Sequence, residues 1–288
     1  MGPEQGDQRY FWDAGGTAFH GSRGGGYCGA RAGVTRGASP VRWDILSVVG
    51  LLLAVGAVLS GQYLDGGQVS MLFNGPALLI VLGGTLGATM LQSPIGVFAR
   101  ALEISAWVLR PPVQPLEPLF NDLIHWCRVA RRDGLLGLEG LVESVHHPFA
   151  RKALQLLIDG NDPELIRETL MTESNAREQR DLQAARVYEG MGGYAPTLGI
   201  LGAVIGLIEV MNHLSDPALL GRGIAVAFVS TVYGVAFANL IFLPMGAKLK
   251  ALVRNETQLD EMITIGITAI ADGENPRVIE SRLQGLLG

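Results

Sequence analysis

Residues 223–247 read GIAVAFVSTVYGVAFANLIFLPMGA, and this stretch is the strongest indication of the fold class. It carries no charged side chain. It is also longer than the roughly 20 residues that an α-helix needs to cross the hydrocarbon core of a bilayer. Three further uncharged stretches occupy residues 45–61, 66–99 and 190–208. The sequence therefore predicts four transmembrane helices.

The overall composition agrees with a membrane protein. Of the 288 residues, 48% are hydrophobic and only 17% are charged, a balance that is unusual for a soluble protein of this length. One apolar run could be a buried core helix, but four in one chain are too many for that explanation. The first run begins at Ile45, too far along the chain for a cleaved signal peptide. The expected fold class is all-α, a polytopic membrane protein with four transmembrane helices and a helical cytoplasmic domain.

Basic residues are placed asymmetrically along the chain. Most of the 22 Lys and Arg residues precede the first apolar stretch, lie between the second and third, or follow the fourth. The segment 62–71 has none, and 212–222 has only Arg222. Because basic residues near span ends stay on the cytoplasmic side, both termini and the long middle segment are expected in the cytoplasm.

These observations divide the chain into five expected segments. The first is rich in Gly and Arg without an apolar period, so it is either a disordered tail or the product of a start codon placed too far upstream. The others are two membrane hairpins and two cytoplasmic parts. In order, the segments are the tail at 1–40, the first hairpin at 44–98, the cytoplasmic helical domain at 99–189, the second hairpin at 190–247 and the cytoplasmic C-terminal helices at 248–288.

Two local signals refine the cytoplasmic parts. Asp162-Pro163-Glu164 is a strong helix start, and no Pro or Gly follows it before Gly190. This helix is expected to continue into the third span. Near the C-terminus, 272–276 reads DGENP, a turn signal. Two short amphipathic helices are therefore predicted after residue 248.

The sequence contains no recognisable catalytic constellation. It has no phosphate-binding loop, nucleophile elbow or metal quartet, so neither an enzyme nor a cofactor is expected. Cys28 and Cys127 lack metal-ligand spacing and are expected to be reduced thiols. His146 and His147 are interpreted as a solvated helix end rather than a metal site. The net charge of −5 gives no reason to expect a nucleic-acid partner.

Small residues recur in the spans at intervals that suit close helix packing. Packing within one bundle and packing in an oligomeric channel both explain them. An ion pathway usually shows an ionisable group in mid-membrane, but the predicted spans contain none. Glu209, near the outer end of the third span, can reach the interface and is interpreted as a solvated end rather than a relay. If ions are moved, their carboxylate must come from another protein. The small residues meant here are Gly83 with Gly87, Gly199 with Gly202 and Gly206, and Gly234 with Ala238.

Several of these runs resemble a known family. GYAPTLGILG at 193–202, AVAFVSTVYG at 225–234 and ANLIFLP at 238–244 are similar to the third and fourth spans of the MotA/PomA flagellar stator family. DILS at 44–47 resembles the usual start of these proteins, and 74–85 resembles their second span. The likeness is greatest to MotC-type members and covers roughly residues 44–288.

The resemblance implies an assembly and a function. It implies a ring of five copies in the lipid of the bacterial inner membrane, surrounding two copies of a MotB-like partner whose Asp carries the ion. In the family, an Arg and a Glu eight residues apart engage the rotor protein FliG. Arg131 and Glu139 match this pair, although Arg132 is an equally plausible candidate. Without the resemblance these residues would be an ordinary solvated helix face.

The resemblance also assigns residues to the ion pathway. Pro196 and Pro244 match two functional prolines of the family, although a simple helix kink would also explain them. Sodium-driven members have threonines in spans three and four. Thr231 matches the second, but the first position is Ala203, so proton coupling is expected. Thr231 could also simply bond back to its own helix.

Two other functions fit the sequence less well. An ExbB/TolQ-like energiser of outer-membrane transport typically has three spans and lacks the segment 131–139. A solute transporter would show a span broken around a polar binding site. The stator subunit is therefore the expected function, with these two as alternatives.

Overall fold

The computed structural model describes residues 44–64, 66, 69–112, 116–215 and 217–285. Every regular element within these ranges is helical, as the expected all-α class requires. Four helices are long and apolar enough to cross a membrane: Ile45–Leu64, Gly75–Gln92, Pro163–Asn212 and Leu220–Ala271. The expected tail at 1–40 lies outside the described residues.

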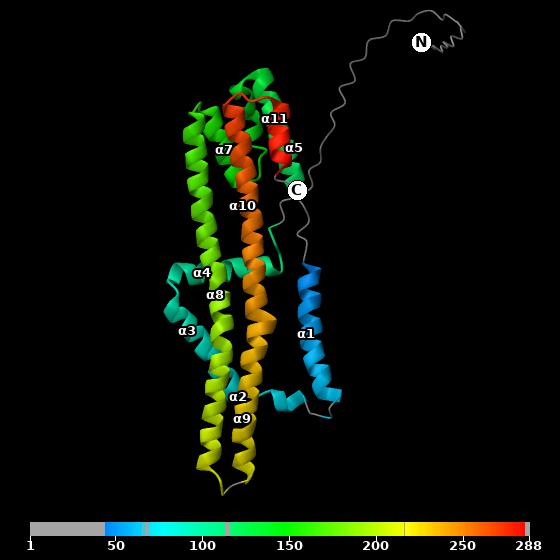
Figure 1. The fold of residues 1–288 in the computed structure, drawn as a ribbon, viewed down its shortest axis with the longest axis vertical. Coiled ribbons are helices and arrows are strands. Elements are labelled where there is room, and N and C mark those ends of the chain that lie inside the picture. Colours follow the sequence, from blue (N-terminus) through cyan, green and yellow to red (C-terminus); the bar gives the residue numbers. More distant parts are fainter. Residues whose placement is uncertain (1–43, 65, 67–68, 113–115, 216, 286–288) are drawn as a thin grey trace, which may run out of the picture. The chain divides into compact units, whose positions relative to one another are not determined.

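Two long antiparallel helical rods are the largest elements of the fold (Figure 1). One rod is α8, Pro163–Asn212, which at 1.5 Å per residue extends about 75 Å. The other consists of α9 (Pro217–Ala236), the π-helical η5 (Phe237–Phe242) and α10 (Leu243–Ala271). The Asp162 carboxylate caps α8 by accepting a 2.9 Å hydrogen bond from the Glu164 amide. The predicted helix start and its continuation into the third span are confirmed.

The C-terminal part differs from the prediction of two short helices. The first of them does not exist as a separate element, because α10 runs without a break from the fourth span to Ala271. The predicted turn then follows, with Gly273 at a φ of +69°. The Asn275 side chain caps α11, Pro276–Gln284. Both rods thus carry membrane helices directly into the cytoplasmic region.

The second span is shorter than the uncharged stretch 66–99 suggested. It consists of α2 (Gly75–Leu78), the π-helical η2 (Leu79–Gly83) and α3 (Gly84–Gln92). Ser93 is extended because the next residue is Pro94, which disfavours a helical conformation in the residue before it. The chain then turns into α4 (Ile95–Ser105) and η3 (Ala106–Val108), which lie across the rods in Figure 1.

The first span, α1 (Ile45–Leu64), is held at both ends but uncovered along its length. None of its residues is buried within the chain. At its start, Lys248 bonds the carboxylate of Asp44 and donates a 2.7 Å hydrogen bond to the Val108 carbonyl. After its end, the 3-10 helix η1 (Val69–Leu72) leads into the second span. The apolar surface of α1 is thus left for lipid or for another chain.

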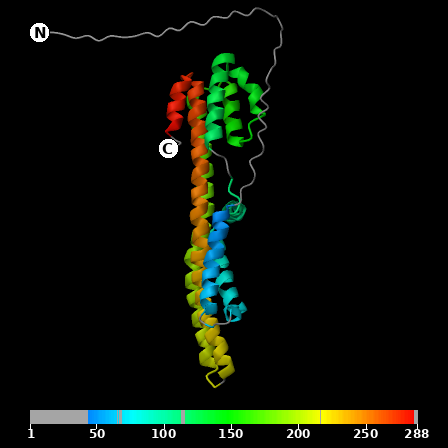
Figure 2. The same cartoon turned by 90° about the vertical axis from the view of Figure 1, so that its right-hand side faces the viewer.

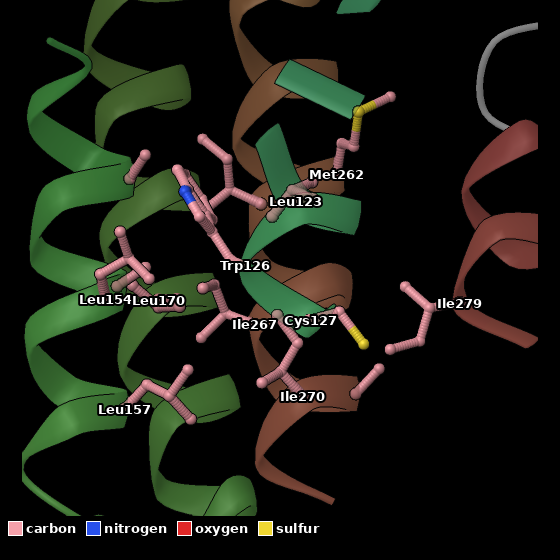
Figure 3. Close-up of a cluster of buried hydrophobic side chains, with 14 of the residues drawn as sticks. Leu123, Trp126, Cys127, Leu154, Leu157, Leu170, Met262, Ile267, Ile270 and Ile279 are labelled. Atoms are coloured by element: carbon pink, nitrogen blue, oxygen red, sulfur yellow. The ribbon is translucent and has the colours of Figure 1, made fainter. Parts of the chain in front are cut away.

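A compact helical lobe packs against the far ends of α8 and α10 (Figure 2). It contains α5 (Leu116–Asp133), η4 (Leu135–Leu138), α6 (Glu139–Val142) and α7 (Pro148–Ile158). Figure 3 shows side chains from α5, α7, α8, α10 and α11 meeting in one apolar core. The core includes Leu123, Trp126, Cys127, Leu154, Leu157, Leu170, Met262, Ile267, Ile270 and Ile279.

Two residues of this lobe illustrate how packing sets local chemistry. Cys127 is a free thiol buried in the core, and burial raises its pKa. His147 is not the solvated helix end that the sequence suggested, because it is buried and its Nδ1 accepts a 3.3 Å hydrogen bond from the Ala150 amide. Burial, with the nearby Arg177, lowers the pKa of His147. The imidazole therefore acts as a neutral cap of α7.

Candidate functional site

The third and fourth spans approach each other closely along a seam of small residues. A methyl group added at Gly206 would lie 2.7 Å from the backbone nitrogen of Ala227. One added at Gly199 would lie 2.9 Å from the Ser230 carbonyl. Gly83 and Gly87, by contrast, have nothing within 4 Å of such a methyl group inside the chain. The small residues of α8 and α9 therefore serve packing within the chain, whereas Gly83 and Gly87 of the second span do not.

This seam brings together Pro196 and Thr231, two of the four expected pathway residues. A methyl group at Gly234 would lie 3.2 Å from the Pro196 Cα, and one at Gly199 would lie 3.4 Å from the Thr231 Cα. Pro196 and Thr231 are therefore on directly facing turns of α8 and α9. Ala203 is half-buried on α8, one turn beyond Gly199.

Thr231 is exposed within the chain, and its hydroxyl already has a local partner. The Oγ1 atom donates a 3.4 Å hydrogen bond to the Ala227 carbonyl of the same helix. The Thr231 hydroxyl thus bonds to its own helix, which is the alternative to an ion-pathway role that the sequence left open. The methyl group of Ala203 supplies no oxygen at all. The two positions together offer at most one weak ion ligand.

Pro244 is separated from this group along the rod. It is the second residue of α10 and follows directly after the π-helical turn η5. A proline inside a helix removes one backbone hydrogen bond and crowds the carbonyl four residues earlier. That carbonyl belongs to Leu240, inside η5, so the wider turn accommodates the proline. The helix continues past Pro244 into the cytoplasmic region, as α8 continues past Pro196.

The structure adds a residue that the sequence did not single out. Ser230 is fully buried on α9, and its Oγ has no hydrogen-bond partner. A methyl group at Gly202 would lie 2.7 Å from this oxygen. A lone serine in an apolar run gives no sequence signal, because its burial depends on which face of α9 meets α8.

The membrane segments of the two rods lack an ionisable residue. No Asp, Glu, Lys or Arg occurs in 190–208 or 223–247. Glu209 follows at the outer end of the third span, where it is exposed and lies 3.3 Å from the Nδ1 of His213. The seam by itself therefore offers no carboxylate to carry a proton across mid-membrane.

The expected rotor-contact residues lie on an exposed corner of the cytoplasmic lobe. Arg131 is in the last turn of α5, and Glu139 begins α6. Between them the chain reverses at Gly134, which has a φ of +75° that favours glycine. Leu136, also in this corner, is 71% exposed. The corner thus presents Arg131, Glu139 and the apolar Leu136 to solvent, beside the exposed pair Arg132 and Asp133.

The structure distinguishes Arg131 from its neighbour. Arg132 is held by Asp133, with an Nη2 to Oδ2 distance of 2.7 Å. Within the described residues, Arg131 makes no ion pair and is exposed. An arginine without an internal partner is better able to pair with another protein, so Arg131 is the stronger candidate of the two.

Charged residues also join α4 to the first rod. Arg100 on α4 binds Asp181 on α8 through two parallel hydrogen bonds, at 2.8 and 2.9 Å. The guanidinium also lies 5.5 Å from the ring centroid of Trp107. Asp181 is almost fully buried. This bidentate pair joins α4 to α8 across 81 residues of sequence.

Comparison with known proteins gives a consistent result. A model of the MotA/TolQ/ExbB proton channel family matches residues 141–262. Motility protein A of Bacillus subtilis is 34% identical over 83% of this chain and 89% of its own length. Chemotaxis protein PomA of Vibrio alginolyticus is 30% identical, covering 85% of this chain and 95% of its own.

The likeness extends to solved structures. The structure of C. jejuni MotAB matches with a TM-score of 0.81 and 31% identity, covering 85% of this chain and 96% of that chain. On this similarity in sequence and structure, the chain belongs to the MotA/TolQ/ExbB proton channel family.

Proposed function

We propose that this chain is the stator subunit of a flagellar motor and that it forms, with a MotB-like partner, a proton channel that converts the ion-motive force into torque. The observation that carries the proposal is the pair of long rods without an ionisable residue in their membrane segments. Such a channel needs a carboxylate from a second protein. The similarity to motility proteins and to a MotAB structure supports the same partner.

The wider assembly follows the family. Five copies of the chain surround the partner in the bacterial inner membrane, with both termini in the cytoplasm. The uncovered apolar surface of α1 suits contact with lipid or a neighbouring copy. The exposed corner with Arg131 and Glu139 contacts FliG on the rotor.

An ExbB/TolQ-like role is the alternative function, because the matching family model includes those proteins. The gene downstream would distinguish them by encoding a MotB-like or an ExbD-like protein.

Proton coupling can be tested in a strain whose only stator is this chain with its MotB-like partner. Such a strain should swim, whereas the strain without the gene should not. The speed should fall to near zero with a protonophore and should not change with external sodium at constant pH. The reason is that Na⁺ needs several oxygen ligands at a constriction, and Ala203 provides none. A speed that follows sodium and resists the protonophore would contradict proton coupling.

Rotor contact can be tested by reversing charges in the exposed corner. Arg131→Glu and Glu139→Lys should each remove most of the torque while leaving membrane levels normal, because like charges would then face each other across the contact. Torque is measured by bead rotation. Arg132→Glu is the matched control and should have a smaller effect. A larger loss of torque in Arg132→Glu than in Arg131→Glu would indicate that Arg132 makes the rotor contact. Wild-type torque in the Arg131→Glu, Glu139→Lys double variant would exclude this corner as the rotor contact.

A further inference from the structure

Beyond the membrane, a cluster of carboxyl groups lies between the two rods. We call it the stalk cluster, and it consists of Glu173 and Asp181 on α8 and Glu256 and Asp260 on α10. Glu256 is nine residues past Ala247, the end of the uncharged stretch, which corresponds to about 14 Å along a helix. The cluster is therefore in the cytoplasmic region and outside the ion pathway described above.

The cations around the stalk cluster are already paired. Arg100 holds Asp181, as described above. Lys152 on α7 binds Glu173, and Arg177 donates to the same carboxylate at 3.0 Å. Arg177 also lies 5.3 Å from the ring centroid of Phe149. Most of the positive charge in this region is therefore used by the two carboxylates of α8.

The two carboxyl groups of α10 are poorly compensated. Asp260 is only 2% exposed. Its Oδ2 accepts a long 3.4 Å hydrogen bond from Arg177 Nη1, an arginine that also pairs with Glu173, and its Oδ1 has no hydrogen-bond partner among the described residues. Glu256, one turn earlier on α10 and only partly exposed, makes no ion pair within the described part of the chain. An ionised carboxylate is costly to bury when its oxygens are not all satisfied, and the cost is relieved when the group takes up a proton.

We propose that Glu256 and Asp260 form a proton-binding site in the cytoplasmic region, whose occupancy sets how tightly α8 and α10 pack against each other. Burial raises the pKa of Glu256 to about 7, and the negative charge of Asp260 adds to this effect. Burial likewise raises the pKa of Asp260 to about 6, although Arg177 opposes the shift. Both values lie in the range where cytoplasmic acidity would change the occupancy.

The groups facing this site come from three other helices. Helix α8 contributes Glu173, Ser174, Arg177 and Asp181. Helix α7 contributes Lys152, with His147 at its N-cap, and α4 contributes Arg100. His147 has a lowered pKa and stays neutral through the relevant range. Proton uptake near neutral pH is therefore assigned to the two α10 carboxyl groups.

The sign of the pH effect follows from the raised pKa values. A folded protein that holds a proton more tightly than the unfolded chain loses stability as the pH rises from the ordinary pKa to the raised one. For Glu256 this window extends from 4.5 to about 7. Glu256→Gln keeps the side chain neutral at every pH. The Glu256→Gln variant should therefore not lose stability as the pH rises through this window.

The test compares thermal unfolding of the full chain and of Glu256→Gln, both in lipid nanodiscs, between pH 5 and 8.5. The variant should unfold at a higher temperature, by roughly 2–5 °C at pH 8, and the difference should shrink towards pH 5. Glu261→Gln, an exposed carboxyl group on the same helix, is the matched control and should show a difference that does not depend on pH. A pH-independent difference for Glu256→Gln, or a lower unfolding temperature at pH 8, would overturn the proposal.

A second measurement keeps the proposal testable if the variant does not fold. The wild-type chain should show the infrared absorption of a protonated carboxylic acid at pH 6, and this band should disappear by pH 8.5. Its absence at pH 6 would overturn the proposal. Both readouts concern the isolated chain, so they are independent of whether it drives a rotor.

Discussion

Replacing Gly206 with alanine is expected to separate the third and fourth spans and to abolish rotation. The added methyl group would lie 2.7 Å from the Ala227 nitrogen and 2.8 Å from the Gly223 carbonyl. Both are backbone atoms, which cannot rotate away, so the helices themselves must move apart. Overpacking of this kind typically costs about 1–3 kcal/mol. Bead rotation and thermal unfolding of the purified chain would measure the two effects.

Gly192→Ala provides a matched control on the same helix. There the added methyl group would lie 2.5 Å from Leu243 Cδ2, an overlap at least as severe in distance. Leu243 is 39% exposed, so its side chain can move to another rotamer while the backbone stays in place. Motility should therefore survive. If motors with each of the two variants rotate normally, the seam between α8 and α9 is not rigid. If motors with each of the two variants fail, the loss of rotation does not depend on whether the added methyl group meets backbone or side-chain atoms.

The effect of Gly206 matters because the seam joins two rods that cross the whole molecule. α8 and the α9–α10 rod have no break at the membrane surface. We therefore expect a change in the seam to be transmitted along both helices to the lobe that carries Arg131 and Glu139. In the proposed motor, this continuity connects the ion pathway with the rotor contact.

Features that depend on neighbouring residues could be predicted from the sequence. The helix start at Asp162 rests on a side chain that caps its own helix, and the turn at Gly273 rests on the positive φ that glycine adopts without strain. The four spans follow from uncharged stretches long enough to cross a bilayer. The missed break after Gln92 was also encoded, since Pro94 stands inside the stretch. Counting uncharged residues gave too little weight to that proline.

Features that depend on helix register could not be predicted. Arg100 pairs with Asp181 across 81 residues, and Arg177 contacts Asp260 across 83. Each side chain alone looks like part of a solvated helix face. They meet only because α4 and α10 pack against particular turns of α8. The same holds for buried Ser230. The family resemblance supplied the rotor and pathway residues, which no local pattern would have revealed.

Removing the carboxylate of Asp181 is expected to destabilise the chain strongly. Asp181→Ala would leave the Arg100 guanidinium without its bidentate partner beside the buried surface of α8. Loss of one partner of a buried pair costs about 3–5 kcal/mol. Arg100 is 24% exposed, so about 3 kcal/mol is expected here. The purified chain should unfold at a clearly lower temperature, and α4 should become more sensitive to protease.

Two further variants separate the pair from general damage to the helix. Glu103→Ala removes the second partner of Arg100, but Glu103 is 66% exposed, and surface pairs contribute little. It should therefore unfold close to the wild type. The double variant Arg100→Met, Asp181→Leu replaces both charges with apolar side chains. It should recover most of the lost stability, because neither buried group then lacks a partner. If the double variant is no more stable than Asp181→Ala, the loss arises from packing of α8 rather than from the unpaired charge.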